Sequence, residues 1–302
     1  MEIKLPEINQ LELEKIKKEK IKELLADDEI NSLINELHFN ENYLLKNVYY
    51  LLKYKQDRDA CKNCQGLEMC SKKSNHLQTL LNLDKDKNLF LTYRKCKYEK
   101  EVEKIKNKFY ARQFENSIFN YKLKNCLDVF AHERLDVIKK YNSFLTGKLS
   151  NGIYLYGSSG TGKSFISSVF AVALAKKDTT KSISYIDCSN EMKALERFYG
   201  SDFSTFNYYI EEMKIAQFLF LDDLGKEYKS QFVLENILLP VLRYRNEHKL
   251  VTFFTSNYSI KYLVNAYSFN KETKLLSQEL FQLISSFTDI VELNGMKYTQ
   301  VK

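Results

Sequence analysis

The sequence predicts an α/β fold with a parallel sheet in its second half, preceded by a mainly helical domain. Two observations lead to this prediction. Five short runs rich in Val, Ile, Tyr and Phe follow residue 150, and amphipathic stretches separate them, as is typical of strands that alternate with helices. Residues 10 to about 57 instead carry Leu and Ile at helical spacing. A length of 302 residues also favours two hydrophobic cores over one.

The composition excludes several classes of protein. With 44% hydrophobic and 28% charged residues, the chain has the balance of a globular protein, not a disordered one. The longest nearly apolar stretch, residues 165–175, is too short for a membrane span. The first twenty residues contain no signal peptide, so we expect a cytoplasmic protein without a membrane partner. A net charge of +7 is too small to predict nucleic-acid binding by itself.

The first domain is predicted over residues 1–108 and the second over residues 109–302. In the first, Asn40 is a candidate cap for a helix that continues through Leu52. The amphipathic faces of these helices fit either core packing or docking of a partner. Residues 58–100 contain a cysteine cluster and end in a strand-like run, NLFLTYRKC. Residues 101–147 are again predicted helical, so the boundary rests on the change of pattern alone.

Four of the six cysteines are crowded between residues 61 and 96, which indicates a structural Zn²⁺ site. The spacing of Cys61 and Cys64 allows a tight turn in which two thiolates bind one tetrahedral ion. Three residues compete for the two remaining positions, and the sequence does not decide between them: Cys70, His76 and Cys96. The isolated Cys126 and Cys188 are expected to be buried small side chains.

A phosphate-binding loop follows the first strand of the second domain. Residues 157–164 match G-x-x-x-x-G-K-[ST], with the strand GIYLY before them and a helical pattern after them. Backbone N–H groups of such a loop point at phosphate oxygens, the lysine reaches the β- and γ-phosphates, and the serine hydroxyl binds Mg²⁺. The predicted ATP site is therefore Gly157, Ser158, Ser159, Gly160, Thr161, Gly162, Lys163 and Ser164.

Two later strands end in polar residues that suit the same chemistry. The run FLFL delivers Asp222 and Asp223, of which we assign the first to Mg²⁺ and the second to the attacking water. Asn257 follows the run LVTFFTS, where its side chain could hold that water against the γ-phosphate.

Arginines are scarce, and none follows Arg245. A P-loop ATPase that assembles into a ring often contacts the γ-phosphate of a neighbour with an arginine. Arg245 is the first candidate for this finger and Arg243 the second. Ring-forming P-loop ATPases usually present a second arginine to the nucleotide from a helix near the C-terminus, but the predicted last helix contains none. Either Lys271 or Lys274 substitutes for it, or nucleotide-dependent closure is weaker.

In this order, GSSGTGKS, FLFLDDLG and TFFTSN resemble the AAA+ ATPases, and more narrowly the DnaI family of bacterial helicase loaders. CKNCQGLEMC and YRKC resemble the zinc-binding head of that family, so the resemblance spans roughly residues 58–295. It implies a slow, partner-regulated ATPase that loads the hexameric replicative DNA helicase onto single-stranded DNA. The N-terminal domain would bind the helicase, and the AAA+ domains would bind single strands and self-associate when partner-bound.

Three alternatives to a loader stay open at this point. A transposition-helper AAA+ ATPase would share the three nucleotide motifs, but it would not be expected to carry a cysteine-rich helical head. A zinc-headed binding module could use ATP only as a conformational ligand. A small-molecule kinase would be expected to show a lid or an acceptor site, and none is evident in the sequence.

Overall fold

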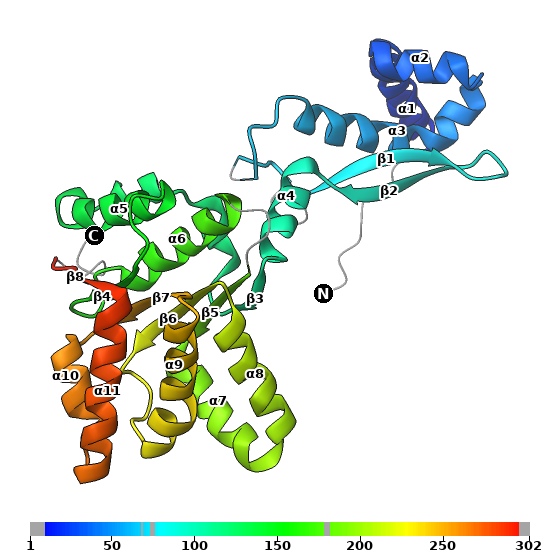
Figure 1. Ribbon diagram of the computed structural model, residues 1–302. Coiled ribbons are helices and arrows are strands. Elements are labelled where there is room, and N and C mark those ends of the chain that lie inside the picture. Colours follow the sequence, from blue (N-terminus) through cyan, green and yellow to red (C-terminus); the bar gives the residue numbers. More distant parts are fainter. Residues whose placement is uncertain (1–9, 68, 73–75, 178–181, 296–302) are drawn as a thin grey trace, which may run out of the picture. The chain divides into compact units, whose positions relative to one another are not determined.

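The structure, a computed structural model, describes residues 10–67, 69–72, 76–177 and 182–295. The chain divides into two compact units, residues 1–102 and 103–302 (Figure 1). The division lies within the helix α4 (Lys97–Lys106), close to the predicted boundary. The roles that we assign to the two parts remain predictions.

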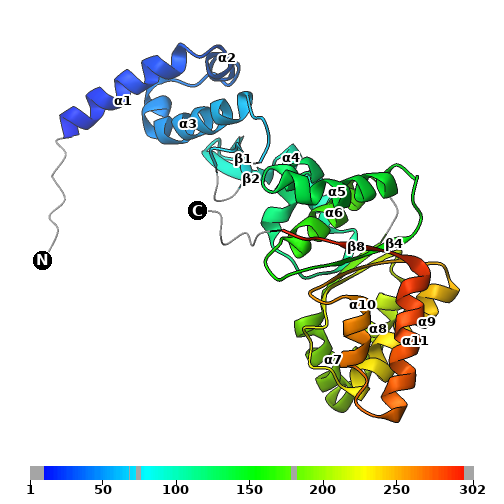
Figure 2. The same ribbon diagram turned by 90° about the vertical axis from the view of Figure 1, so that its left-hand side faces the viewer.

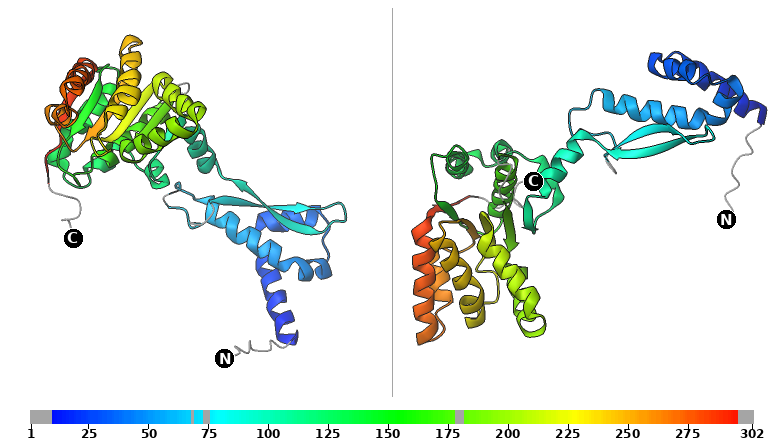
Figure 3. Two further views of the ribbon diagram at one scale, coloured as in Figure 1. Left: turned by 90° about the horizontal axis from the view of Figure 1, so that it is seen from below. Right: turned by 45° about the vertical axis from the view of Figure 1, so that its right-hand side comes forward.

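The first unit contains three helices and a hairpin, which packs along the third helix (Figure 3). The predicted helices are confirmed, and Asn40 caps the third one by accepting a hydrogen bond from the Tyr43 N–H at 2.9 Å. The strand-like run is also confirmed, but its antiparallel partner strand was not predicted, because a two-stranded hairpin beside a cysteine cluster leaves little periodic signal. The elements are α1 (Gln10–Leu25), α2 (Asp28–Glu36), α3 (Glu41–Lys62), β1 (Leu77–Leu83) and β2 (Leu89–Lys95).

A small apolar core joins these elements. The helical stripes supply most of it, and the hairpin adds one residue, so the amphipathic faces serve core packing over much of their length. Tyr49 on α3 is an exception, with 67% of its surface exposed. The buried residues are Ile21, Leu24, Ile30, Ile34, Leu44, Val48, Leu51 and Leu89.

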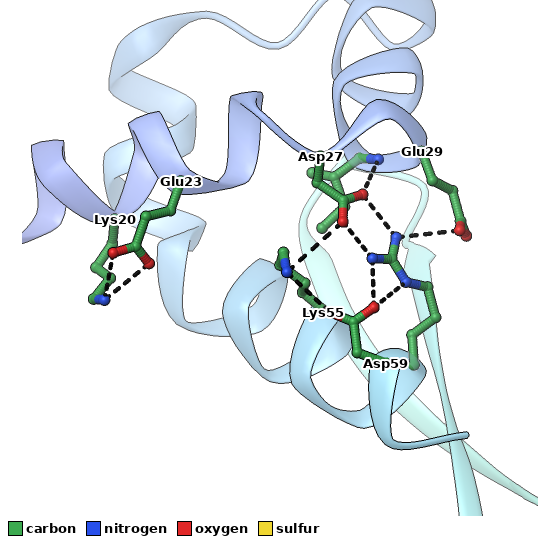
Figure 4. A network of polar contacts seen from close by, with 8 residues as sticks. Lys20, Glu23, Asp27, Glu29, Lys55 and Asp59 are labelled. Carbon is green, nitrogen blue, oxygen red and sulfur yellow. Dashed lines mark hydrogen bonds and ion pairs between the residues drawn. The ribbon is translucent and has the colours of Figure 1, made fainter. Parts of the chain in front are cut away.

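An ionic network fixes α2 against α3 (Figure 4). Asp27 caps α2 by accepting from the Ile30 N–H at 3.1 Å, and it also accepts from the Arg58 guanidinium on α3 at 2.8 Å. Arg58 further contacts Asp59, and Lys55 lies 3.8 Å from Asp27. The hydrogen bonds from Arg58 hold the pKa of the Asp27 carboxyl well below its usual range. The cap of one helix is thereby tied to the next.

The second unit is built on a parallel sheet whose strand order is β3-β5-β6-β7-β4-β8 in the described residues. All five predicted strands are present and parallel, so the predicted α/β fold with a parallel sheet is confirmed. The prediction of five strands is nevertheless wrong, because a sixth strand pairs with β5 at the edge. The strands are β3 (Phe109–Arg112), β4 (Gly152–Tyr156), β5 (Ile183–Asp187), β6 (Phe218–Leu224), β7 (Val251–Ser256) and β8 (Thr288–Glu292).

The prediction of helix throughout residues 101–147 is also wrong. In this stretch α4 ends at Lys106, and the edge strand and two 3₁₀ segments follow before the next α-helix begins. A four-residue strand and single 3₁₀ turns are too short to produce a sequence period, so pattern reasoning could not detect them. The segments are η1 (Asn116–Asn120), η2 (Leu123–Leu127) and α5 (Ala131–Leu145).

Helices cover both faces of the sheet (Figures 1 and 2). Strand residues alternate between the faces: Leu219 and Leu221 of β6 join the core under one layer, whereas Phe220 stacks toward Phe253 and Phe170 of α6 on the other. Burial on both sides explains the unbroken apolar runs in the sequence. One layer contains α5 and α6 (Lys163–Lys177), and the other contains α7 (Cys188–Ser201), α8 (Phe203–Ile215), the π-helical segment η3 (Val233–Leu238), α9 (Leu239–Glu247), α10 (Ile260–Ala266) and α11 (Lys271–Phe287).

A helix that crosses a bilayer needs about 20 predominantly apolar residues. Even α6, which is buried along most of its length, has only 15 residues. Within the described ranges, no helix combines the length and the apolar character needed to cross a membrane.

Candidate functional site

The phosphate-loop motif lies between β4 and α6, at the carboxyl edge of the sheet. Gly160 and Gly162 have φ of +86° and +95°, a backbone conformation that side chains strongly disfavour. A Cβ atom at Gly162 would also lie 2.5 Å from the Arg134 guanidinium. Two glycines are therefore required for the curl of the loop. The carboxyl ends of β4, β6 and β7 meet here, because β7 pairs with both of the other strands.

Lys163 begins α6 and folds back over the loop. Its ammonium group donates to the carbonyl oxygens of Gly157 and Ser158 and to Oδ1 of Asn257, each at 2.9 Å. The side chain is nearly buried, and burial lowers its pKa, an effect that the nearby Asp223 opposes. Two residues from motifs 94 positions apart are thus brought into direct contact.

Asp222 ends the buried part of β6 and is 8% exposed. The pKa of its carboxyl is raised to about 6, chiefly by burial and also by the neighbouring Asp223, while hydrogen bonds from Thr255 and Ser164 oppose this rise. The Ser164 hydroxyl and Asp222 therefore lie together, as residues that share a Mg²⁺ ion must. Thr255 was not predicted, although it is a polar residue inside an otherwise apolar strand run.

Asp223 has a left-handed backbone conformation, with φ of +57°. Its N–H donates to Oγ1 of Thr255 at 2.9 Å, so Thr255 orients both acidic residues. Its carboxylate accepts from Nζ of Lys226 at 2.5 Å. The register of β6 against β7 shifts between Leu221 and Leu224, and this irregularity turns Asp223 out of the strand.

Several of these groups line a cavity of about 570 Å³. Ser159, Lys163, Asp223 and Asn257 line one end of it. Its volume is within the range of small-molecule and cofactor sites, and its lining combines cations, acids and backbone amides. The residues present thus fit a Mg²⁺-bound nucleotide. The other end is lined by the segment that precedes α5, including Tyr121, Asn125 and Asp128, which sequence reasoning missed because that segment was predicted helical.

Arg134 of α5 holds the phosphate loop through a hydrogen bond. It is 2% exposed, and its guanidinium donates to the carbonyl oxygens of Thr161 at 2.9 Å and Cys126 at 3.1 Å. It therefore connects the loop to η2 at the other end of the cavity. The scarcity of arginine in the chain was the signal that could have singled it out.

The prediction of Arg245 as an arginine finger is wrong. Its side chain is fully buried, and it donates to Oγ1 of Thr252 and to the carbonyl oxygens of Met213, Lys214, Ala216 and Val251. These partners lie at the amino ends of β6 and β7, opposite the phosphate loop. A guanidinium held by so many acceptors inside the sheet cannot reach a neighbouring subunit. Arg243 is exposed, and it pairs with Glu279 of α11 at 2.5 Å.

The last predicted helix, α11, is a core helix between β7 and β8. It packs on α9 and α10 through buried residues such as Leu280 and Ile284. Neither Lys271 nor Lys274 at its start lines the nucleotide cavity. The structure therefore does not support either lysine as a replacement for the missing arginine.

All five predicted zinc ligands line a second cavity of about 300 Å³ in the first unit: Cys61, Cys64, Cys70, His76 and Cys96. Their side chains are not arranged as a coordination sphere: across the described residues, no group of three or more acidic, cysteine or histidine side chains is placed to hold a metal ion. Cys96 instead accepts from the Glu99 N–H at 3.4 Å, and His76 lies 3.5 Å from the Glu99 carboxylate. Zinc binding stays a prediction.

Comparison with known proteins supports one family. No family model matches the chain. It is 24% identical over 269 residues to the replicative helicase loader DnaI of Bacillus subtilis (strain 168), an alignment that covers 84% of this chain and 83% of the relative. A crystal structure of DnaI is 27% identical with a TM-score of 0.53, over 62% of this chain and 98% of the other. The chain is therefore similar to DnaI helicase loaders over most of its length.

A second solved structure shares the fold of this chain's second unit. It is a putative primosome component from Streptococcus pyogenes serotype M3, with 23% identity and a TM-score of 0.51 over 64% of this chain and 97% of the other. The predicted resemblance to the DnaI family, made on three short motifs and the cysteine cluster, is thus confirmed over most of the chain's length.

Proposed function

We propose that this chain is an ATP-dependent loader that delivers the hexameric replicative DNA helicase onto single-stranded DNA during initiation or restart of replication, in the cytoplasm. One observation supports the nucleotide part most strongly: Lys163, Asp223 and Asn257 converge on one cavity from three separate motifs. The likeness to DnaI supports the helicase as partner.

The residues of the three motifs each have a role in this proposal. Lys163 and the loop N–H groups bind the phosphates, and Ser164 with Asp222 holds Mg²⁺, which neutralises phosphate charge. Asp223 accepts a proton from the attacking water, and Asn257 orients that water. Since Asn257 and Asp223 are both engaged by lysines in the structure, these contacts must rearrange before water can be activated. We therefore propose slow hydrolysis that a partner regulates.

The partner is tested by native mass spectrometry of the full chain with the replicative helicase of the same organism, in the presence of ATP and Mg²⁺. We expect a defined complex with the helicase hexamer, in which loader AAA+ domains also contact each other. A variant that lacks residues 1–102 should form no complex, because the contact is proposed for the N-terminal domain. Its circular dichroism spectrum should still be that of a folded α/β protein. If the full chain forms no complex, the loader proposal fails.

ATP control is tested in the same system by helicase capture on circular single-stranded DNA. Lys163→Met should still bind the helicase but not promote its loading. Lys274→Met is the matched control, because Lys274 does not line the cavity, and it should load as well as wild type. Equal loading by all three proteins would show that ATP binding at Lys163 does not drive delivery.

We also propose a structural Zn²⁺ in the cysteine-lined cavity. The donors present are thiols and an imidazole, which zinc prefers, and a head with so small an apolar core gains stability from a metal. We expect one zinc ion per chain by plasma mass spectrometry of the purified protein.

Single serine or alanine variants identify the four ligands. Four of the changes at Cys61, Cys64, Cys70, His76 and Cys96 should remove the metal, and the fifth should leave it. Cys188→Ser is the control, since Cys188 is buried in the core of the second unit and should keep full occupancy. Zinc-free protein with an unchanged helical spectrum would refute the site.

A further inference from the structure

The lining of the nucleotide cavity includes a cationic side chain, Lys226, that no motif predicted. Within its described lining the cationic side chains are Arg134, Lys163 and Lys226. Arg134 donates hydrogen bonds to two carbonyl oxygens, and Lys163 donates to three acceptors. Lys226 is different, because its ammonium group pairs with Asp223 while 42% of its side-chain surface stays exposed. It can move without breaking a buried network.

The backbone that carries Lys226 is held in place. The Lys226 N–H donates to the Asp223 carbonyl at 3.0 Å. The N–H of the preceding residue, Gly225, donates to the carboxylate of the following residue, Glu227, at 2.7 Å. Glu227 is 3% exposed and also accepts from the hydroxyl of Tyr267. A rigid turn therefore presents a long, flexible side chain to the cavity.

The charges around Lys226 indicate its ligand. It lies beside Asp223, the acid proposed to act on the water at the γ-phosphate. Lys226 and Lys163 line the same cavity, and the positive charge of Lys226 contributes to the lowered pKa of Lys163, for which burial is the larger cause. A terminal phosphate carries roughly two negative charges and three acceptor oxygens, and it competes strongly with one carboxylate for a lysine.

We propose that Lys226 is a second phosphate-binding residue, which leaves Asp223 and contacts the γ-phosphate when a nucleoside triphosphate binds. This rests on the proposed nucleotide site. The contact supplies the charge that an arginine on the last helix would give, since no arginine follows Arg245 and neither Lys271 nor Lys274 lines the cavity. It also frees the Asp223 carboxylate only when a γ-phosphate is present, so Lys226 distinguishes ATP from ADP.

The test is calorimetric titration of Lys226→Met with Mg²⁺ and either ADP or the non-hydrolysable analogue AMPPCP. Methionine keeps the length of the stem and removes the charge. We expect affinity for AMPPCP to fall roughly tenfold, the loss of one charge-assisted contact, and affinity for ADP to change less than about twofold. Lys226→Arg should retain most of the discrimination, and Lys274→Met should match wild type.

Other outcomes contradict the proposal in separable ways. If Lys226→Met binds both nucleotides as wild type does and hydrolyses ATP faster, Lys226 only masks Asp223. If both affinities fall equally, Lys226 stabilises the site without reading the γ-phosphate. If wild type binds neither nucleotide, the proposed function itself fails and this inference fails with it.

Discussion

Lys163→Met is expected to lower nucleotide affinity about 100-fold or more, because two charge-assisted contacts to phosphate are lost at about 1.5–3 kcal/mol each. Lys163 is suited to this role by its position at the start of α6, where the helix N-terminus adds to the attraction for an anion. Calorimetric titration with ADP and with AMPPCP in Mg²⁺ measures the loss. Both nucleotides should be affected, in contrast to the selective effect expected for Lys226→Met.

The control for this prediction is the fold of the variant. Lys163 donates to two loop carbonyls and to Asn257, so its replacement also removes hydrogen bonds within the loop. The far-ultraviolet circular dichroism spectrum of the variant should nevertheless match that of wild type, since neither the strands nor the helices that cover the sheet depend on these bonds. A folded Lys163→Met protein with affinity within about threefold of wild type would refute the phosphate site.

Arg245→Met is expected to destabilise the second unit by about 3–5 kcal/mol, because several buried acceptors lose their hydrogen-bond donor at about 1–3 kcal/mol each. The change leaves four backbone carbonyls and the Thr252 hydroxyl without this donor, at the end of α8 and the start of β7. Urea unfolding followed by circular dichroism should show an earlier transition. Hydrogen exchange should be faster in β6 and β7, which carry or adjoin these acceptors.

Arg243→Met provides the comparison, because Arg243 lies on the same helix and pairs with Glu279 at the surface. Half-exposed pairs of this kind contribute about 1 kcal/mol or less, so this variant should unfold close to wild type. An arginine finger at position 245 would behave in the opposite way. Its methionine variant would be stable and would lose only the hydrolysis that depends on assembly.

The parts of the site that could be predicted from the sequence are those with a local cause. The phosphate loop requires glycines at fixed spacing because its backbone adopts positive φ, so the motif is visible in the sequence itself. Asp222 and Asn257 were predicted because parallel strands are apolar runs that end in polar residues at one edge. Their meeting at Lys163 follows from the pairing of β6, β7 and β4.

The residues that were missed act through contacts that no motif or period reveals. Thr255 matters because β7 pairs beside β6, and Lys226 because the turn after Asp223 directs it into the cavity. Arg134 supports the loop from a helix that the sequence pattern merged with its neighbours. The first-unit hairpin and β3 were misread for a related reason, since short strands carry almost no periodic signal.

The sequence by itself determined the class of the fold, the phosphate loop and the acidic strand end, because each depends on backbone preferences and side-chain periods within about ten residues. Only the tertiary structure decided which charged side chains are free to act. In the sequence, neither Arg245 nor Lys226 stands in a pattern that tells whether its side chain is buried or exposed. Chain packing buries the first among carbonyl oxygens and leaves the second at the mouth of the nucleotide cavity. Burial depends on the whole fold, so no local pattern can report it.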